Sequence, residues 1–150
     1  MRISLVFLLS LFMQAAWAGS PVKWSFTADH AAGDSVVVHL TAVCDPGWHI
    51  YALTLPSDDG PLPTVITVQS DSLYHTAGPV VEPTPKEKDD PNFGMRVRYH
   101  TGTVVFVQPL LRHTAGAFTI HGNVEYMTCN DSTCLPPVTV PFHLNIAASK

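Results

Sequence analysis

The sequence predicts an all-β protein, and three observations carry this prediction. The 150 residues include 13 prolines and 9 glycines, which interrupt helices and suit short strands joined by turns. Apolar and polar residues alternate with a period of two in one segment after another. Beyond the N-terminal segment, no window of about eleven residues keeps a helical period. About seven to nine short strands in one domain predict an immunoglobulin-like antiparallel β-sandwich, with a small barrel as the alternative.

The first half of the chain contains four predicted strands. Residues 22–28 alternate Trp, Phe and Ala with Lys, Ser and Thr, which indicates one buried face. Residues 35–43 are β-branched and almost continuously apolar, as is typical of a strand inside a sandwich. Residues 47–53 and 64–69 are shorter strands. The turn-forming residues 58–63 separate them.

The second half contains four more predicted strands. Residues 95–100 alternate Met, Val and Tyr with Arg, Arg and His, which predicts one buried face and one exposed face. A Thr-Gly turn joins them to the strand of residues 103–110, and residues 118–124 alternate again. Residues 138–146 form the last strand. Because proline cannot donate a hydrogen bond to a neighbouring strand, Pro141 predicts an edge position.

The segment of residues 82–92 breaks this pattern. Its sequence, EPTPKEKDDPN, is charged and rich in proline, so we expect an exposed loop. The loop ends in Phe93-Gly94, an aromatic residue beside a flexible one. Loops of this length in a small domain are usually functional or disordered.

Composition and the N-terminus limit the possible functions and locations. A charge of −4, from 8 Lys+Arg against 12 Asp+Glu, excludes a nucleic-acid partner that needs a basic face. Residues 1–18 are typical of a secretory signal peptide: Arg2, the apolar residues 3–13, and the Ala-Trp-Ala cleavage motif at residues 16–18. The apolar stretch is shorter than the roughly 20 residues of a membrane span. We expect cleavage to leave one soluble periplasmic domain, residues 19–150, without membrane insertion.

Two cysteines carry the most informative chemistry. Cys129 and Cys134 enclose Asn-Asp-Ser-Thr between two strand patterns, which places them across a hairpin where a disulfide can form. A stapling disulfide is the commonest fate of such a pair in an exported domain. So short a loop stabilises by only about 2 kcal/mol, and an exposed disulfide beside Pro136-Pro137 is accessible to an attacking thiolate. A structural and a redox-active disulfide are both compatible with this spacing.

The remaining cysteine, histidine and tryptophan residues give weaker indications of function. Cys44 is expected to be a small buried hydrophobe. A zinc or copper site would need a second cysteine pair or an H-x3–5-H motif after the C-x4-C pair, so we expect no metal, and we expect no cofactor. Trp24 and Trp48 are interpreted as core aromatics. Three histidines on polar strand faces receive no role: His39, His100 and His143.

Three segments follow the order and spacing of one known family. They are residues 124–137 (VEYMTC, then CLPP), residues 45–51 (DPGWHIY) and residues 90–94 (DPNFG). They resemble, respectively, the cysteine hairpin, an early Gly-aromatic-x-x-Tyr strand and the cap loop of the N-terminal periplasmic domain of the thiol:disulfide interchange protein DsbD. The resemblance extends over most of residues 22–146.

The resemblance implies a domain that relays reducing equivalents. In the family, a membrane domain reduces the disulfide of this module, which then reduces oxidised periplasmic proteins through mixed disulfides. By position, Cys134 would form the mixed disulfide and Cys129 would resolve it. The implied partners, acting in trans, are thioredoxin-like or membrane thiol:disulfide interchange proteins, together with oxidised periplasmic proteins. The domain would be an electron carrier more than an enzyme with a bound substrate.

The resemblance also implies a cap and a supporting strand. Phe93, or its neighbour Asn92, would cover the cysteines. His49 and Tyr51 would lie beneath them on one strand face, because residues i and i+2 point the same way. The chain departs from the best-known members in two ways. It has one residue fewer between the cysteines and His49 in place of an aromatic hydroxyl. We also expect it to act without the family's membrane and thioredoxin domains, so that electrons would arrive from a separate protein.

Two other functions stay open at this point. A non-catalytic immunoglobulin-like binding module would keep Cys129–Cys134 as a permanent disulfide, and a metal chaperone would bind copper or zinc. No basic residue neighbours the cysteines in sequence, and Asp131 would raise their pKa. We therefore expect a weak attacking thiol that reacts mainly within a docked complex.

Overall fold

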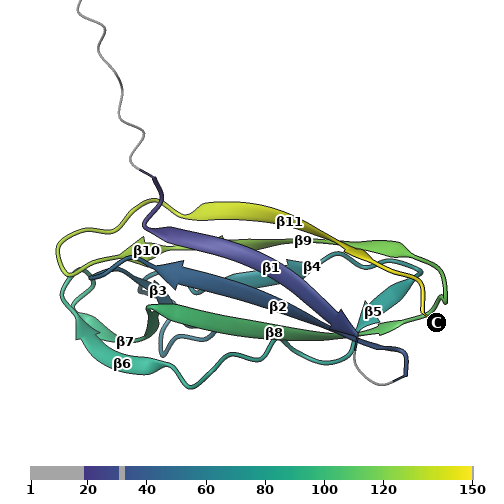
Figure 1. Cartoon of the computed structure of the whole chain (residues 1–150). Coiled ribbons are helices and arrows are strands. Elements are labelled where there is room, and N and C mark those ends of the chain that lie inside the picture. Colours follow the sequence, from purple (N-terminus) through teal and green to yellow (C-terminus); the bar gives the residue numbers. More distant parts are fainter. Residues whose placement is uncertain (1–18, 31–32, 150) are drawn as a thin grey trace, which may run out of the picture.

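The alternating segments form antiparallel strands in the computed structural model, which describes residues 19–30 and 33–149 (Figure 1). The predicted signal peptide, residues 1–18, lies outside the described residues. The strands are β1 (Val22–His30), β2 (Ser35–Cys44), β3 (His49–Tyr51), β4 (Val65–Val68), β5 (Tyr74–Thr76), β6 (Lys86–Asp90), β7 (Met95–Thr101), β8 (Thr103–Arg112), β9 (Phe118–Tyr126), β10 (Thr128–Cys129) and β11 (Val138–Ile146). Among the described residues, no helix is long and apolar enough to cross a membrane.

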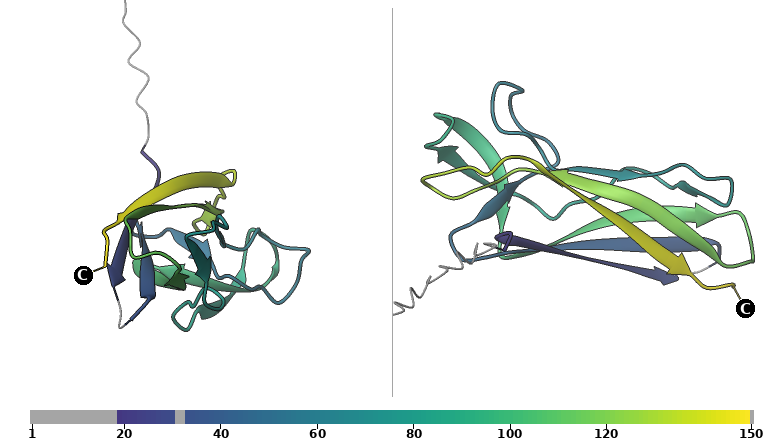
Figure 2. Two further views of the ribbon diagram at one scale, coloured as in Figure 1. Left: turned by 90° about the vertical axis from the view of Figure 1, so that its right-hand side faces the viewer. Right: turned by 90° about the horizontal axis from the view of Figure 1, so that it is seen from above.

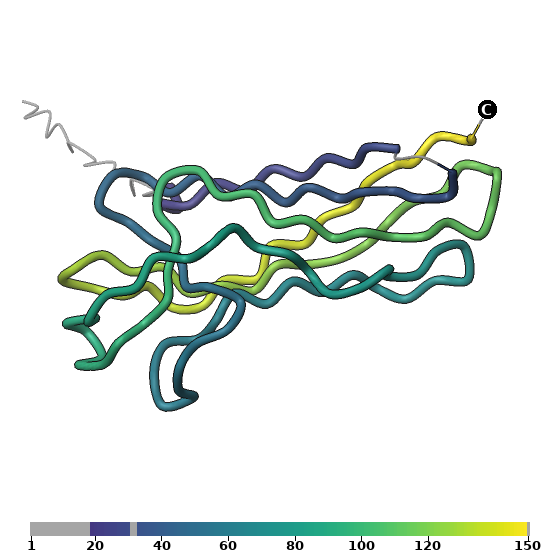
Figure 3. Tube along the Cα trace, turned by 90° about the horizontal axis from the view of Figure 1, so that it is seen from below, coloured from purple at the N-terminus to yellow at the C-terminus, as the bar shows by residue number. Residues whose placement is uncertain are grey.

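The strands form three sheets, two of which make a sandwich. One layer has the strand order β1-β2-β8-β5 and the other the order β11-β9-β4, and the long strands of the two layers face each other (Figure 2). The third sheet, β10-β3-β7-β6, lies at one end of the sandwich, on the left of Figure 3. The predicted immunoglobulin-like antiparallel sandwich is confirmed.

The main core lies between the two long sheets. Alternate residues of β2 point into it, and Val36, Val38 and Leu40 are fully buried. The opposite face of β2 is mostly half-buried, because β2 lies between β1 and β8 within one layer. Trp24 of β1 packs against the core, with its ring centroid 5.9 Å from that of Phe106. Its interpretation as a core aromatic is therefore confirmed.

Proline and glycine mark an edge and a turn as predicted. Pro141 lies in β11, at the edge of its sheet. Gly102 has φ 64° in the turn between β7 and β8, a left-handed conformation that favours glycine.

The expectation of an exposed loop over residues 82–92 is wrong in part, because residues 86–90 form β6, which pairs with β7. Charge rather than apolar alternation supports this pairing. Glu87 accepts hydrogen bonds from Arg96 and Arg98 across the ladder at 3.0 and 3.3 Å. Hydrophobic periodicity does not detect a strand whose cross-strand partners are ions. The short strands β5 and β10 were also outside the predicted set.

One polar residue of β7 is buried against expectation. His100 was predicted to lie on an exposed face, yet it is 6% exposed. Its Nε2 lies 2.9 Å from Oε2 of Glu82, and its ring meets that of Phe106 edge-on at 5.6 Å. A carboxylate from the preceding segment thus satisfies the imidazole, which allows it to be buried.

Candidate redox site at the end of the sandwich

The two cysteines form a disulfide across a tight hairpin. Cys129 ends β10 and pairs with Cys134, with their Cα atoms 4.1 Å apart. Asn130 shapes the turn between them, since its Oδ1 accepts hydrogen bonds from the N–H groups of Ser132 and Thr133 at 2.9 and 2.8 Å. The predicted hairpin and disulfide are confirmed.

The two cysteines differ in exposure. Cys129 is fully buried, and it packs in a small second core with Tyr51 and Val97. Cys134 is only half-buried. An incoming thiol or disulfide therefore meets Cys134 more easily than Cys129.

Strand β3 lies directly against the hairpin. His49 and Cys129 are opposite each other in the antiparallel register, and the hydroxyl of Thr128 donates to the carbonyl of His49 at 2.8 Å. The rings of His49 and Tyr51 meet edge-on at 5.2 Å. The structure thus places both residues beside the cysteines and on one face, as the resemblance implies.

The turn of residues 91–94, between β6 and β7, carries both candidate cap residues and is called the cap loop below. It contacts the hairpin in two ways. Phe93 packs with the cluster that contains Tyr51 and both cysteines, and its ring centroid lies 6.2 Å from that of Tyr51. Asn92 is exposed, and its Nδ2 donates to the carbonyl of Asn130 at 2.9 Å. Both candidate cap residues therefore reach the hairpin, one by apolar packing and one by a hydrogen bond.

A buried carboxylate connects the cap loop to β3. Asp90 is 1% exposed; its Oδ2 accepts from the Tyr51 hydroxyl at 2.7 Å and its Oδ1 from the Asn92 N–H at 2.9 Å. Burial alone would raise the pKa of Asp90, but these hydrogen bonds and the positive charge of Lys88 outweigh it and hold that pKa below its ordinary value. Burial, together with the bond to this carboxylate, raises the pKa of Tyr51, so Tyr51 stays a neutral donor.

Sequence reasoning did not select Asp90, although it belongs to the DPNFG segment that was noted. The DPNFG motif contains Asp90, but the burial of this carboxylate depends on Tyr51, which lies 39 positions away in the sequence. Only the fold brings these two side chains together.

An ion pair links β6 to the cysteine hairpin. Nζ of Lys88 lies 3.0 Å from Oδ1 of Asp131 and 5.1 Å from the ring centroid of Tyr99. Asp131, which the sequence analysis expects to raise the pKa of the cysteines, is thus paired with a lysine that is distant in sequence. Lys88 offsets its charge, and the imidazole of His49 lies across from Cys129.

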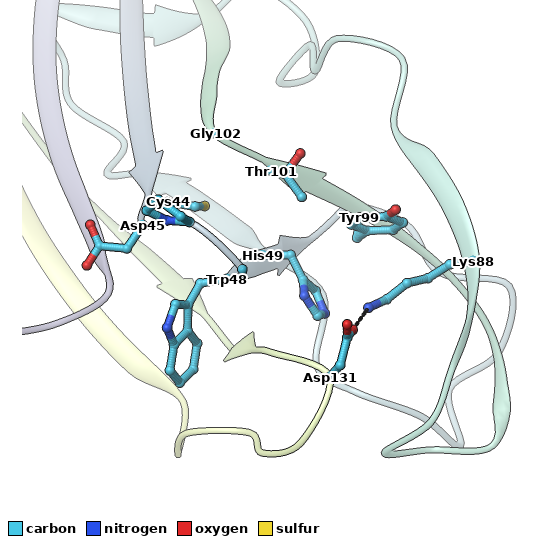
Figure 4. Close-up of a pocket in the computed structure, with 11 residues that line it drawn as sticks. Cys44, Asp45, Trp48, His49, Lys88, Tyr99, Thr101, Gly102 and Asp131 are labelled. Atoms are coloured by element: carbon cyan, nitrogen blue, oxygen red, sulfur yellow. Dashed lines mark hydrogen bonds and ion pairs between the residues drawn. The ribbon is translucent and has the colours of Figure 1, made fainter.

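A pocket of about 440 Å³ lies beside this ion pair (Figure 4). Its lining includes Cys44, Trp48, His49, Lys88, Tyr99 and Asp131. Trp48 was interpreted as a core aromatic, and this is wrong. It is half-buried at the pocket and packs in neither core cluster of the described residues.

Cys44 is the free cysteine of the described chain, and it is buried. Burial and, more weakly, the charge of Asp45 raise its pKa to about 11, against a hydrogen bond with the Ile50 backbone. It is thus an unreactive thiol at neutral pH. Within residues 19–30 and 33–149, no group of three or more His, Cys, Asp or Glu residues is arranged to hold a metal ion.

Comparison with known proteins gives one family match. The model of the family described as "Thiol:disulfide interchange protein DsbD, N-terminal" matches residues 19–145. No curated protein sequence matches significantly.

Solved structures also match the chain, and the two with TM-scores above 0.5 are similar in fold. The N-terminal periplasmic domain of ScsB from Proteus mirabilis is 21% identical with a TM-score of 0.59, over 85% of this chain and 46% of that one. The reduced DsbD N-terminal domain of Neisseria meningitidis is 20% identical with a TM-score of 0.51, over 83% and 86%. A complex of the DsbD and PilB N-terminal domains of Neisseria meningitidis is 19% identical with a TM-score of 0.47, over 79% of this chain and 80% of that one. The chain thus spans about half the length of the ScsB chain that it matches.

Proposed function

Because this chain belongs to the family of N-terminal domains of the thiol:disulfide interchange protein DsbD, we propose that it is a periplasmic module that relays reducing equivalents. The relay uses the Cys129–Cys134 pair and mixed disulfides with protein partners. The observation that carries this proposal is the disulfide itself, buried at Cys129, half-buried at Cys134 and part of the cluster on which Phe93 packs.

The exposure difference supports separate roles for the two cysteines. In the reduced domain, the Cys134 thiolate attacks a partner disulfide, so that a Cys134–partner bond forms and one partner thiolate leaves. Cys129 then attacks Cys134, which forms the Cys129–Cys134 disulfide and releases the second partner thiolate. Two electrons pass to the partner. A donor dithiol reverses the same steps and reduces the domain again.

The cap loop accounts for selectivity. With Phe93 packed on the cluster that contains Cys129 and Asn92 bonded to the hairpin, the loop restricts the approach of small oxidants to the half-buried disulfide. A docking protein that displaces the loop exposes Cys134 only within the complex. The proposed partners, in trans, are thioredoxin-like or membrane thiol:disulfide interchange proteins on the donor side and oxidised periplasmic proteins on the acceptor side.

The reduction potential of the mature domain tests this proposal. We expect a value of about −200 to −250 mV for Cys129–Cys134, within the range of exchange proteins. The protein is equilibrated in graded glutathione or dithiothreitol buffers, alkylated, and its labelled cysteines are located by mass. Cys44→Ala serves as the control, because it removes the third thiol and leaves the pair intact.

A potential below about −300 mV would identify a structural disulfide. The chain would then be a non-catalytic immunoglobulin-like binding module.

Single cysteine variants give an independent check of the roles of the two cysteines. Cys129→Ser is expected to accumulate mixed disulfides with oxidised partners, whereas Cys134→Ser is expected to accumulate far fewer.

A further inference from the structure

One buried ring nitrogen at the site has no hydrogen-bond partner. The side chain of His49 is 3% exposed, and its Nε2 lacks a hydrogen bond to any described residue. Oδ2 of Asp90 lies 3.7 Å away from this nitrogen. Because an unpartnered buried polar atom destabilises a fold, its presence at this site points to a function that requires it.

The position of His49 suggests that function. Residues directly opposite in an antiparallel pair project to the same face with neighbouring Cβ atoms, and His49 is directly opposite Cys129. We propose that His49 accepts the proton of the Cys129 thiol when this thiol resolves the mixed disulfide, with Asp90 stabilising the imidazolium. This inference rests on the proposed relay. It adds to the relay the group that activates the Cys129 thiol.

The surroundings keep the imidazole in the form that can accept a proton. Burial, and then the charge of Lys88, lowers the pKa of His49, against the opposing effects of Asp90 and Asp131. Neutral imidazole therefore predominates at pH 7. The titratable groups around it come from every neighbouring element: Tyr51 on β3, Lys88 and Asp90 on β6, Tyr99 on β7, Cys129 on β10, and Asp131 in the hairpin.

Asp90 is suited to stabilise the charged ring. It is buried and is fixed by the Tyr51 hydroxyl and the Asn92 N–H, and its lowered pKa keeps it ionised. A carboxylate beside a histidine orients the ring and stabilises the imidazolium once it forms. Lys88 opposes that charge less strongly than an unpaired lysine, because it is bonded to Asp131.

The proposed step balances as follows. The Cys129 S–H gives its proton to the His49 ring, and the resulting thiolate attacks Sγ of Cys134 in the mixed disulfide. The Cys129–Cys134 bond forms while the Cys134–partner bond breaks, and the partner leaves as a thiolate. The imidazolium then returns its proton to that thiolate or to water. His49 lines the pocket beside the Lys88–Asp131 pair (Figure 4), which gives the proton a path to solvent.

Stopped-flow reaction of the reduced mature protein with 5,5′-dithiobis(2-nitrobenzoate) separates the two steps. Attack by Cys134 releases a first equivalent of coloured thiolate, and resolution by Cys129 releases a second. All proteins carry Cys44→Ala, so that only the pair reacts. The variant is His49→Gln, and the matched control is His143→Gln, which changes an exposed histidine on β11.

We expect His49→Gln to slow the second phase by about tenfold or more at pH 7. The first phase and the equilibrium potential should stay unchanged. The difference should shrink towards pH 9.5, where hydroxide deprotonates the thiol directly. The control should match the parent protein in both phases.

A second phase in His49→Gln that equals the parent rate at pH 7 overturns the proposal. So does an equal slowing of both phases at every pH, which indicates a structural role. If the variant fails to fold, the parent pH profile decides. A second-phase rate that levels off above pH 6.5 supports His49, and a rise of about tenfold per pH unit up to pH 8 overturns it. Absence of any second equivalent in the parent would instead refute the redox function itself.

Discussion

Phe93 and Asn92 hold the cysteine hairpin from the same turn by different forces. Phe93 packs on the cluster around Cys129, and Asn92 makes a single exposed hydrogen bond to Asn130. An exposed hydrogen bond contributes little, because water replaces it. Apolar packing, in contrast, is expected to keep water and small reagents away from the sulfur atoms.

Phe93→Ala is therefore expected to make the reduced pair react severalfold faster with a small oxidant such as hydroxyethyl disulfide. Asn92→Ala, the control in the same turn, should change that rate by less than about twofold. Thiol loss followed by timed alkylation measures both rates. A larger effect of Asn92→Ala would assign the cap to Asn92, and two unchanged rates would remove the cap from the mechanism.

The sequence predicts most residues of the candidate site, but not all of the side chains that surround them. The resemblance selected the cysteines, His49, Tyr51 and the cap residues, and the structure brings these together. Asp90 and Lys88 were not selected as site residues, because their partners are distant in sequence: Asp90 bonds to Tyr51, and Lys88 to Asp131. Contacts formed by folding leave no local pattern.

Strand β9 lies between β4 and β11, and its residue Gly122 has no room for a side chain. A Cβ placed on Gly122 would lie 2.5 Å from the carbonyl oxygen of Thr67 on β4, and it would collide with the ring of Phe142 on β11. The backbone oxygen cannot move without disturbing the β4–β9 ladder. Glycine is needed here for close approach rather than for an unusual backbone conformation.

Gly122→Ala is expected to lower the free energy of unfolding by about 2 kcal/mol or more, since overpacking forces the strands apart. Urea denaturation followed by tryptophan fluorescence measures this change. Gly19→Ala is the matched control, because its Cβ would meet nothing within 4 Å. A loss below about 0.5 kcal/mol for Gly122→Ala would mean that β4 or Phe142 relaxes freely.

The strands divide by the force that supports them, and this explains which ones the sequence predicts. Strands β2 and β9 bury every second side chain, and the sequence predicts them closely, β2 from its β-branched apolar run and β9 from its alternation. Strand β6, with the sequence KEKDD, buries only Asp90. Its pairing depends on charges of β7, which are visible only after the two strands are aligned. Strands β5 and β10 have three and two residues, too few to show any period.

In the whole molecule, the candidate redox site lies apart from the main core. The long sheets enclose the main apolar core, while the cysteines and residues of β3 and β7 form a second cluster. We therefore expect the cap loop to open by local motion while the sandwich stays folded. The site, however, contains buried ionisable groups, so its protonation is coupled to the stability of the complete domain.

The sign of this coupling follows from His49 and Asp90. Burial and the charge of Lys88 lower the pKa of His49 in the folded state, so the unfolded chain binds a proton more readily below about pH 6.5. The free energy of unfolding then falls as the pH drops from 6.5 towards the folded pKa. Asp90, whose folded pKa is also lowered, adds a second loss below about pH 4, where the unfolded carboxylate takes up a proton first.

We therefore expect the oxidised domain to be less stable at pH 5 than at pH 7, and His49→Gln to lose less stability over this interval than the parent. Urea midpoints at the two pH values, with unchanged transition slopes, measure the difference. His143→Gln is the control, because its histidine is exposed and its removal should leave the pH dependence as in the parent. Parallel losses in all three proteins would show that His49 titrates alike in the folded and unfolded states, which would contradict its burial as a neutral base beside Cys129.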